Sequence, residues 1–291
     1  MELFNQLRKH SGAIAGYITI LILFAVVLSC SSGTKRDIPV KDMKMEVPAG
    51  TQKLTEVLLE GAVPDLKVTH IALKGPYRQK LIVSSDTVSM YIFIKGSGKL
   101  ITDTLSFDIT PESIAIPFIP STSIGLEKGE ELHMVKFSKK LSQQDKQEMK
   151  GFDAENKYWV YFTKFSDCEP YTEKIKSPNT VSRTVVPAGI VPRVSLGTVE
   201  APGPDKVGAH EHPMLEQLFL GLANNDITVH ADELSTSFKA YSLLHIPLGS
   251  SHWVEVNSEK KMYYLWMDFF GNKEGQEWLK THKPMNAQKD K

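Results

Sequence analysis

The chain has 291 residues, which is room for two ordinary domains or for one large domain with a sizeable core. Hydrophobic residues make up 41% of it and charged residues 23%, the balance of an ordinary globular protein. The 34 basic residues equal the 34 acidic ones, and this net charge of zero excludes the basic excess on which nucleic-acid binding relies. The two cysteines, Cys30 and Cys168, are too few for a disulfide framework.

The first thirty residues have the pattern of an export signal rather than of a folded element. A basic start at residues 8–10 precedes an uncharged, mostly apolar run from Ser11 to Ser29, and the small residue Ser29 stands directly before Cys30. These three features mark a secretory signal. The alternative is an uncleaved membrane anchor with an incidental cysteine, for which the apolar run is slightly short. Either reading places the body of the chain outside the cytoplasm and next to a membrane.

The sequence Leu28-Ser29-Cys30 resembles the lipoprotein box of bacteria. The resemblance implies that residues 1–29 are removed as a signal peptide and that the Cys30 thiol is acylated. Residues 30–50, which are polar and without a regular pattern, are then expected to be a tether. We therefore expect a lipid-anchored protein of the bacterial cell envelope that faces the periplasm or the exterior.

From about Leu54 onward, short runs of β-branched, aromatic and alternating residues are separated by turn residues. This spacing predicts an all-β sandwich or barrel. Helical periodicity is scarce, and only Leu141 to Met149 and Glu274 to Leu279 favour a short helix. The clearest strand candidates are 80–83, 90–94, 113–116, 133–137 and 158–162.

Two stretches of the chain share one pattern and indicate an internal duplication. Residues 83–122 and 210–252 each begin with a strand and a tight turn, and each contains a late strand that runs into a proline. We therefore expect two tandem barrels, at 51–165 and 166–275, followed by a C-terminal tail at 276–291.

The second stretch carries a candidate metal site. His210, His212 and Glu216 share parity, so a regular strand would direct all three to one face. His252 follows a Pro-x-Gly turn farther along the chain and would complete a set of three histidines and one carboxylate. Imidazole with carboxylate suits a divalent transition metal, and the candidates are iron, manganese, nickel, copper, cobalt and zinc.

These residues resemble the two signature motifs of the cupin superfamily. The first motif is His-x-His followed after three or four residues by Glu, and the second is Pro-x-Gly-x-x-His. The chain matches the second at Pro247, Gly249 and His252, with Asn257 one position late, and it lacks the glycine that closes the first motif. The resemblance implies two double-stranded β-helix (jelly-roll) barrels and names His210, His212, Glu216 and His252 as the ligands of one metal ion: iron, manganese, nickel or zinc.

The first stretch lacks such a set. Aligning the turns and prolines of the two stretches puts Val83, Ser85, Ser89 and Thr122 where the four ligands stand. None of these side chains is a useful ligand for a divalent ion, so we predict a metal-free first barrel that packs against the second and shapes its mouth.

The family resemblance implies a fold and a metal but no single reaction. We expect a metal-dependent enzyme, of oxygenase, isomerase or hydrolase type, that acts on a small oxygenated organic molecule. The alternatives are a non-catalytic envelope module that binds a sugar or a small carboxylic acid, and a scaffold in a membrane assembly. The expected partners are a small-molecule ligand, the membrane through the lipid, and a second copy of the chain. No general base can be named from the sequence.

Several other residues near the motifs have weaker patterns. His230 and His245 lie outside the motifs and are expected to be structural or surface residues. Strand alternation lets only about half of the aromatic residues Trp253, Tyr263, Tyr264 and Trp266 line the barrel.

Overall fold

The computed structural model of the protein describes residues 37–156 and 160–281. The predicted signal peptide and Cys30 lie outside the described residues. Among the described residues, no helix combines the length and the apolar character that a membrane span requires.

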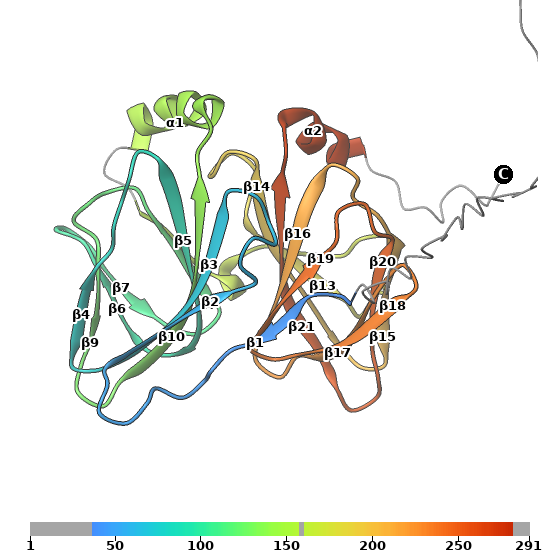
Figure 1. Ribbon diagram of the computed structural model, residues 1–291, viewed down its shortest axis with the longest axis horizontal. Coiled ribbons are helices and arrows are strands. Elements are labelled where there is room, and N and C mark those ends of the chain that lie inside the picture. The colour runs from blue at the N-terminus through green and yellow to red at the C-terminus, as the bar shows by residue number, and fades with distance from the viewer. Residues whose placement is uncertain (1–36, 157–159, 282–291) are drawn as a thin grey trace, which may run out of the picture. The chain divides into compact units, whose positions relative to one another are not determined.

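The first barrel consists of two antiparallel sheets (Figure 1). The larger has the order β11-β8-β5-β10-β3-β2, and the smaller has the order β4-β9-β6-β7. The strands are β2 (Lys53–Leu58), β3 (Leu66–Lys74), β4 (Tyr77–Lys80), β5 (Thr87–Gly96), β6 (Gly98–Ile101), β7 (Ser106–Ile109), β8 (Ser113–Pro117), β9 (Ser123–Leu126), β10 (Glu131–Lys140) and β11 (Val160–Lys164).

The second barrel repeats this plan. Its larger sheet has the order β1-β19-β16-β21-β14-β13-β12, and its smaller sheet has the order β15-β20-β17-β18. The strands are β1 (Val40–Asp42), β12 (Pro170–Tyr171), β13 (Val181–Val186), β14 (Val194–Pro202), β15 (Asp205–His210), β16 (Leu215–Gly221), β17 (Asp226–Ala231), β18 (Leu234–Lys239), β19 (Ser242–Ile246), β20 (His252–Val256) and β21 (Lys261–Phe270). The prediction of two tandem all-β barrels is confirmed.

The N-terminal strand β1 departs from the expectation for residues 30–50. It pairs with β19 of the second barrel, Val40 opposite Leu244, although the chain then continues into the first barrel (Figure 1). In the first barrel the same edge position, beside β8, is held by β11. Ile38, Met43 and Val47 are also buried. From residue 37 on, the segment is therefore part of the fold rather than a tether, because its apolar side chains contribute to the cores.

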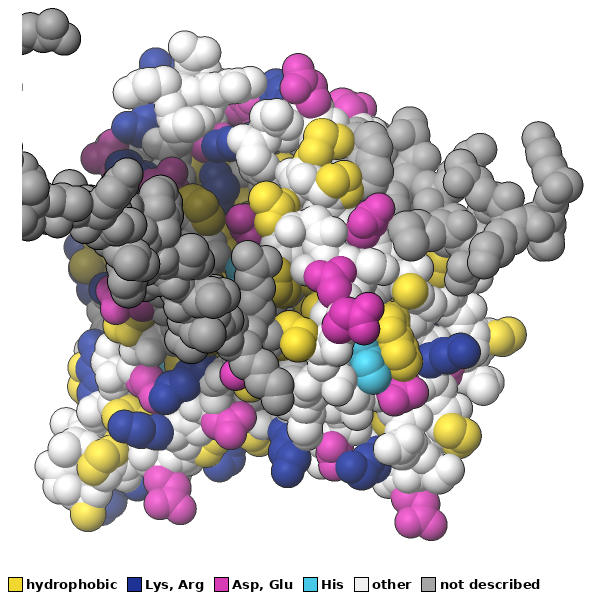
Figure 2. All heavy atoms as spheres, turned by 45° about the vertical axis from the view of Figure 1, so that its right-hand side comes forward, with side chains coloured by type: hydrophobic (Ala, Val, Ile, Leu, Met, Phe, Trp, Pro, Cys, Tyr) yellow, Lys and Arg dark blue, Asp and Glu magenta, His cyan; other side chains and the backbone are white. Residues whose placement is uncertain are grey.

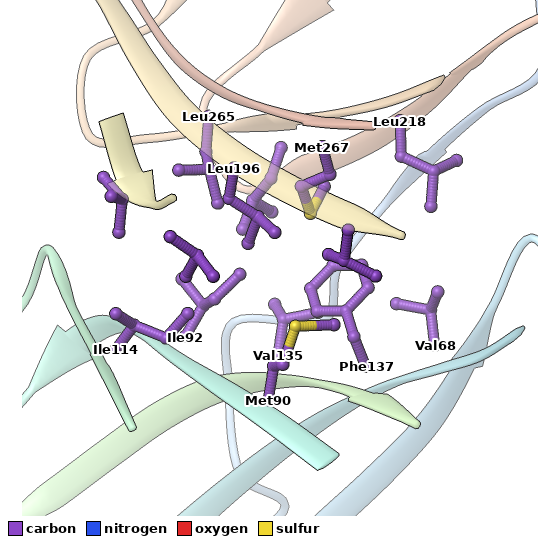
Figure 3. Packing of buried hydrophobic residues seen from close by; sticks show 14 of the residues in the cluster. Val68, Met90, Ile92, Ile114, Val135, Phe137, Leu196, Leu218, Leu265 and Met267 are labelled. Atoms are coloured by element: carbon purple, nitrogen blue, oxygen red, sulfur yellow. The ribbon is translucent and has the colours of Figure 1, made fainter. Parts of the chain in front are cut away.

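The two larger sheets pack face to face through one continuous core. Val68, Met90, Ile92, Val135 and Phe137 of the first barrel meet side chains of the second barrel there (Figure 3). The labelled partners in that view are Leu196, Leu218, Leu265 and Met267. Because side chains alternate along a strand, the residues between these positions point the other way, into the interior of each barrel. Each barrel interior has its own separate cluster of buried residues.

Two helices cap the barrels, α1 (Gln143–Asn156) and α2 (Lys273–Thr281). The start of α1 is fixed by a reciprocal cap in which the Asp145 amide donates to Ser142 Oγ at 3.1 Å and the Ser142 amide donates to Asp145 Oδ2 at 2.9 Å. Arg193 of the second barrel donates to the same carboxylate, Nε to Oδ1, at 2.8 Å. Lys273 Nζ also lies 2.8 Å from Glu148 Oε1, so both contacts tie α1 to the second half of the chain.

The surface has charges of both signs. On the face shown in Figure 2, Lys and Arg side chains are interspersed with Asp and Glu side chains and do not gather into one patch of a single sign. This mixture agrees with the net charge of zero.

Candidate metal centre

Three histidines converge in the second barrel. His210 is the last residue of β15 and His252 is the first residue of β20, and the two stand directly opposite each other in the strand register. A register shift between Val207 and His210 marks a bulge in β15 just before the histidine. Positive φ at Gly249, of 76°, shapes the turn that leads from Pro247 to His252.

His212 comes from the short connection between β15 and β16 rather than from a strand. The ring centroids of His210 and His212 are 4.9 Å apart, those of His210 and His252 are 4.3 Å apart, and those of His212 and His252 are 5.3 Å apart. One nitrogen from each ring lies within 4.8 Å of the other two, which is a spacing that one metal ion could bridge.

Backbone carbonyls orient two of the rings. Nδ1 of His210 lies 2.8 Å from the carbonyl oxygen of Gly208, and Nδ1 of His252 lies 3.2 Å from that of Ser250. A carbonyl only accepts, so the proton of each neutral ring stands on Nδ1 and the lone pair on Nε2. This is the arrangement by which metal-binding histidines are usually held, so the residues fit a divalent transition metal.

The structure does not bring Glu216 to the three histidines. Its Oε2 lies 3.0 Å from Nε2 of His245, on the side of β16 that faces away from the barrel interior. The parity argument fails because residues 211–214 are not part of a strand, so the alternation that starts at His210 does not continue into β16. Within β16, Leu218 and Leu220 share the outward face with Glu216, and Phe219 shares the inward face with Gln217.

Gln217 therefore occupies the inward position that the sequence assigned to a carboxylate. Its Nε2 donates to Oδ1 of Asp268 at 2.8 Å, across the directly paired strands β16 and β21. Burial raises the pKa of Asp268 to about 7, an effect that nearby Glu173 increases and that the Gln217 bond and Lys176 oppose. This carboxyl therefore changes its protonation state close to neutral pH.

The sequence prediction missed Gln217 and Asp268. A signal for Gln217 was present, because the first cupin motif allows four residues between the second histidine and the next ligand, and that spacing ends at residue 217. Asp268 lies within an apolar run of β21 and has no motif of its own.

A cavity of about 300 Å³ opens above the histidines. Lys176 and Glu173 form an ion pair in its wall, and Lys176 Nζ also donates to Ser182 Oγ at 2.8 Å. Burial lowers the pKa of Lys176, and Glu173 opposes this shift. Aromatic residues of the wall are Tyr171, Phe219, Trp253, Tyr264 and Trp266.

The remaining predicted residues lie elsewhere. Tyr263 points to the inter-barrel side, where its hydroxyl donates to Glu112 Oε2 at 2.7 Å, as expected for one member of an alternating aromatic run. His230 stacks on Trp253, with ring centroids 3.6 Å apart, and it belongs with His245 among the histidines outside the triad.

In the first barrel, the positions that the sequence pattern aligned with the predicted ligands form no ligand cluster. Ser89 Oγ lies 3.4 Å from Ser138 Oγ, and Thr122 Oγ1 donates to the carbonyl oxygen of Ile119 at 3.0 Å. Within residues 37–156 and 160–281, the histidine triad of the second barrel is the one group with metal-binding geometry.

Comparison with known proteins identifies the fold. No protein-family model matches the chain, and no curated protein matches it. A protein of Pseudomonas aeruginosa named as glyoxylate-induced aligns with a TM-score of 0.62 and 11% identity, over 76% of this chain and 82% of that one. Oxalate decarboxylase of Lactobacillus farciminis, in a formate complex, aligns with a TM-score of 0.58 and 13% identity, over 86% of this chain and 92% of that one.

The name of a third solved structure contains the word cupin. The cupin 2 conserved barrel domain protein of Leptotrichia buccalis aligns with a TM-score of 0.55 and 12% identity, over 81% of this chain and 98% of that one. Likenesses at such identities establish the fold and no activity. The chain folds as two tandem cupin barrels, and the second holds a histidine triad that could bind a metal ion.

Proposed function

We propose that the second barrel binds one divalent transition-metal ion, iron, manganese, nickel or zinc, through ring nitrogens of His210, His212 and His252. The convergence of the three imidazoles carries this proposal, together with the carbonyl bonds that fix the tautomers of His210 and His252. Three neutral nitrogens leave open coordination positions, which is typical of catalytic rather than structural metal sites.

The reaction proposed for this site is a metal-dependent conversion of a small oxygenated organic molecule. The metal would supply polarisation of a substrate oxygen or activation of a bound water or of O₂. The cavity of about 300 Å³ limits the substrate to a small molecule. Phe219, Tyr264 and Trp266 give it an aromatic wall for the carbon skeleton of the substrate.

Asp268 is the residue suited to move a proton there. Its pKa of about 7 is matched to acid–base catalysis near neutral pH. Because Gln217 donates to Oδ1, the exchangeable proton belongs on Oδ2. Lys176 and Glu173 supply a cation and an anion in the wall that can orient an oxygenated substrate.

The test measures metal content and turnover together. Metal-stripped protein is reloaded with Fe(II), Mn(II), Ni(II) or Zn(II) and assayed on a panel of carboxylic, phenolic and sugar substrates that covers oxygenation, isomerisation and hydrolysis. We expect the wild type to retain about one metal ion per chain and His212→Ala to retain none, with little change in fold. His245→Ala is the matched control, because that histidine bonds Glu216 outside the triad. A wild type that retains no metal would refute the proposal.

A binding module without catalysis is the second candidate function. It is favoured by Gln217, a neutral side chain where the cupin motif has a carboxylate. Asp268→Asn separates the two: an enzyme that uses this proton loses turnover but keeps its substrate affinity, whereas a binding module shows no turnover in either protein and keeps its ligand.

We further propose that Cys30 carries lipid, on the support of the basic start, the apolar run and the Leu28-Ser29-Cys30 sequence. Ile38 is already buried in the second barrel, so residues 31–37 alone would separate the lipid from the fold. That segment spans at most about 25 Å when fully extended, which would hold the barrels close to the membrane surface. Incorporation of a labelled fatty acid into the wild type but not into Cys30→Ala tests this, and equal labelling of both proteins would refute it.

A further inference from the structure

The first barrel has a cavity of its own, of about 450 Å³, on the inner face of its larger sheet. Lys136 and Ser138 of β10 line it beside Tyr91 of β5, and β3 contributes Lys67 on the other side. The strand registers show that this cavity corresponds to the metal cavity: Lys136 stands opposite Tyr91, just as Trp266 stands opposite Phe219 in the second barrel. The other lining residues are Lys53, Thr55, Thr69, Ile71, Tyr77, Gln79, Lys80 and Ile82.

The cavity is cationic. Four lysines line it, Lys53, Lys67, Lys80 and Lys136, and no acidic residue does. In the part of the chain that the structure describes, none of the four forms an ion pair with a carboxylate, and Lys53 Nζ instead lies 3.0 Å from Gln79 Oε1. The lysine of the second cavity differs in this respect, because Glu173 neutralises Lys176.

Lys136 is the central charge of this group. It projects from the middle of the sheet, is half-buried, and its Nζ lies 5.7 Å from the centroid of the Tyr91 ring. Burial lowers the pKa of Lys136, and the positive charges of Lys67 and Lys53 lower it further. A partly desolvated cation beside two like charges costs stability unless an anion compensates it.

We propose that the first barrel binds a small organic anion with two or more negative charges, through the ammonium groups of Lys136, Lys67 and Lys53, with Lys80 at the rim. Lysine ammoniums act as point charges for carboxylate or phosphate oxygens and do not require the bidentate geometry that arginine provides. Tyr91 and Ile71 supply an apolar floor for the carbon skeleton of the ligand. The first barrel would then be a second ligand site that works without a metal.

The test is calorimetric titration of the full chain with two probes, tricarballylate for polycarboxylates and glycerophosphate for phosphate esters, with acetate as the monovalent reference. We expect at least one polyanion to bind the wild type, about tenfold or more tightly than acetate, and to weaken as salt is raised. Lys136→Met should lower that affinity about tenfold or more and, because it removes an uncompensated cation while keeping the apolar stem, should raise the melting temperature of the unliganded protein.

Two controls locate the site. His212→Ala removes the proposed metal site and should leave polyanion binding unchanged, so failure of the metal proposal and failure of this one are distinguishable. Lys128→Gln removes an exposed lysine outside the cavity and should also leave binding unchanged. If Lys136→Met does not fold, Lys67→Gln, an exposed position, decides the question by the same loss of affinity. The proposal is overturned if neither polyanion binds the wild type, if the cavity variants bind as tightly as the wild type, or if His212→Ala abolishes binding.

Discussion

The two barrels keep the same sheets and differ in the side chains at their mouths. In the second barrel, Gln217 and Asp268 form a buried polar pair between β16 and β21. In the first barrel, the corresponding strands β5 and β10 carry Ser89 and Ser138 as the opposed pair. The amide and carboxyl pair of one barrel is thus matched in the other by two hydroxyls, which do not titrate in the physiological range.

The next inward-facing residues along the paired strands differ even more between the two barrels. Trp266 lies against Gly197, where a Cβ would come within 2.3 Å of the indole, so glycine is required for the ring to pack flat on the sheet. At the corresponding row of the first barrel, Lys136 stands opposite Thr69. A duplicated fold can therefore carry an aromatic-walled cavity in one copy and a cationic cavity in the other, because the inner rows vary while the core between the barrels is kept.

The largest expected effect is loss of the metal from the second barrel. His252→Ala removes one of three ligands and should reduce bound metal from about one equivalent to almost none, with metal affinity lowered more than about 100-fold, beyond the loss expected for a supporting residue. The control is Thr122→Ala, because the sequence pattern aligns Thr122 of the first barrel with His252. This variant should leave the metal content unchanged. Elemental analysis of both proteins after dialysis checks this, and metal retained by His252→Ala would contradict the assigned ligand set.

The second effect concerns the shared core. Phe137 is fully buried between the barrels, so Phe137→Ala should lower the free energy of unfolding by about 3–5 kcal/mol. Because the core is continuous, we expect one unfolding transition that shifts as a whole. The matched control, Phe93→Ala, removes an equally buried ring from the interior of the first barrel alone. Denaturant titration followed by fluorescence measures the transitions. The coupling would be contradicted if two separate transitions appeared and Phe137→Ala shifted only one of them.

The third effect is a pH dependence that Asp268 should give the second barrel and that the serine pair at the corresponding position of the first barrel should not give. The folded-state pKa of Asp268, about 7, is raised above its unfolded value near 4. A raised pKa contributes stability that is complete below pH 4 and is lost as pH rises through 7. In metal-free protein, Asp268→Asn should abolish this loss, which is on the order of 4 kcal/mol over that interval at about 1.4 kcal/mol per pKa unit. Unfolding free energies at about pH 3, about pH 5.5 and about pH 8 bracket both pKa values and measure it, and parallel pH profiles for the two proteins would rule it out. Ser138→Ala should leave the profile unchanged.

The sequence predicted the fold well because period-two alternation and turn residues are local features that a duplicated β-barrel repeats. The three histidines were also predictable, since two motifs with fixed spacing contain them: His210 and His252 stand at strand ends and His212 lies in the connection between β15 and β16. The prediction of Glu216 as a ligand was wrong because the parity argument assumes an unbroken strand. The connection at 211–214 interrupts the alternation, so later residues face the opposite side from the one that parity predicts. Strand β1 was missed because three residues carry too little pattern, and its partner β19 lies some two hundred residues away in the chain.

The cationic cavity of the first barrel was not predictable either. Its lysines come from strands β2, β3, β4 and β10, and each reads in the sequence as an ordinary surface charge. Only the register, which places Lys67 opposite Ser138 and Lys136 opposite Thr69, shows that Lys67 and Lys136 share one face.

The smallest expected effect tests how the turn before His252 is specified. Gly249 has a φ of 76° and would have no atom within 4 Å of an added Cβ, so Gly249→Ala introduces backbone strain and no clash. The expected destabilisation is about 1–2 kcal/mol, the usual penalty of a left-handed conformation for a residue with a Cβ. Since β20 remains paired with β15 and β17, His252 should keep its place and the metal content should not change. Gly271→Ala, at a glycine that also has open space but no positive φ, should have a smaller effect. Thermal unfolding together with metal analysis separates the outcomes: equal stability of the two variants would show that the backbone conformation at Gly249 is not strained, and loss of metal would show that the turn itself positions the ligand.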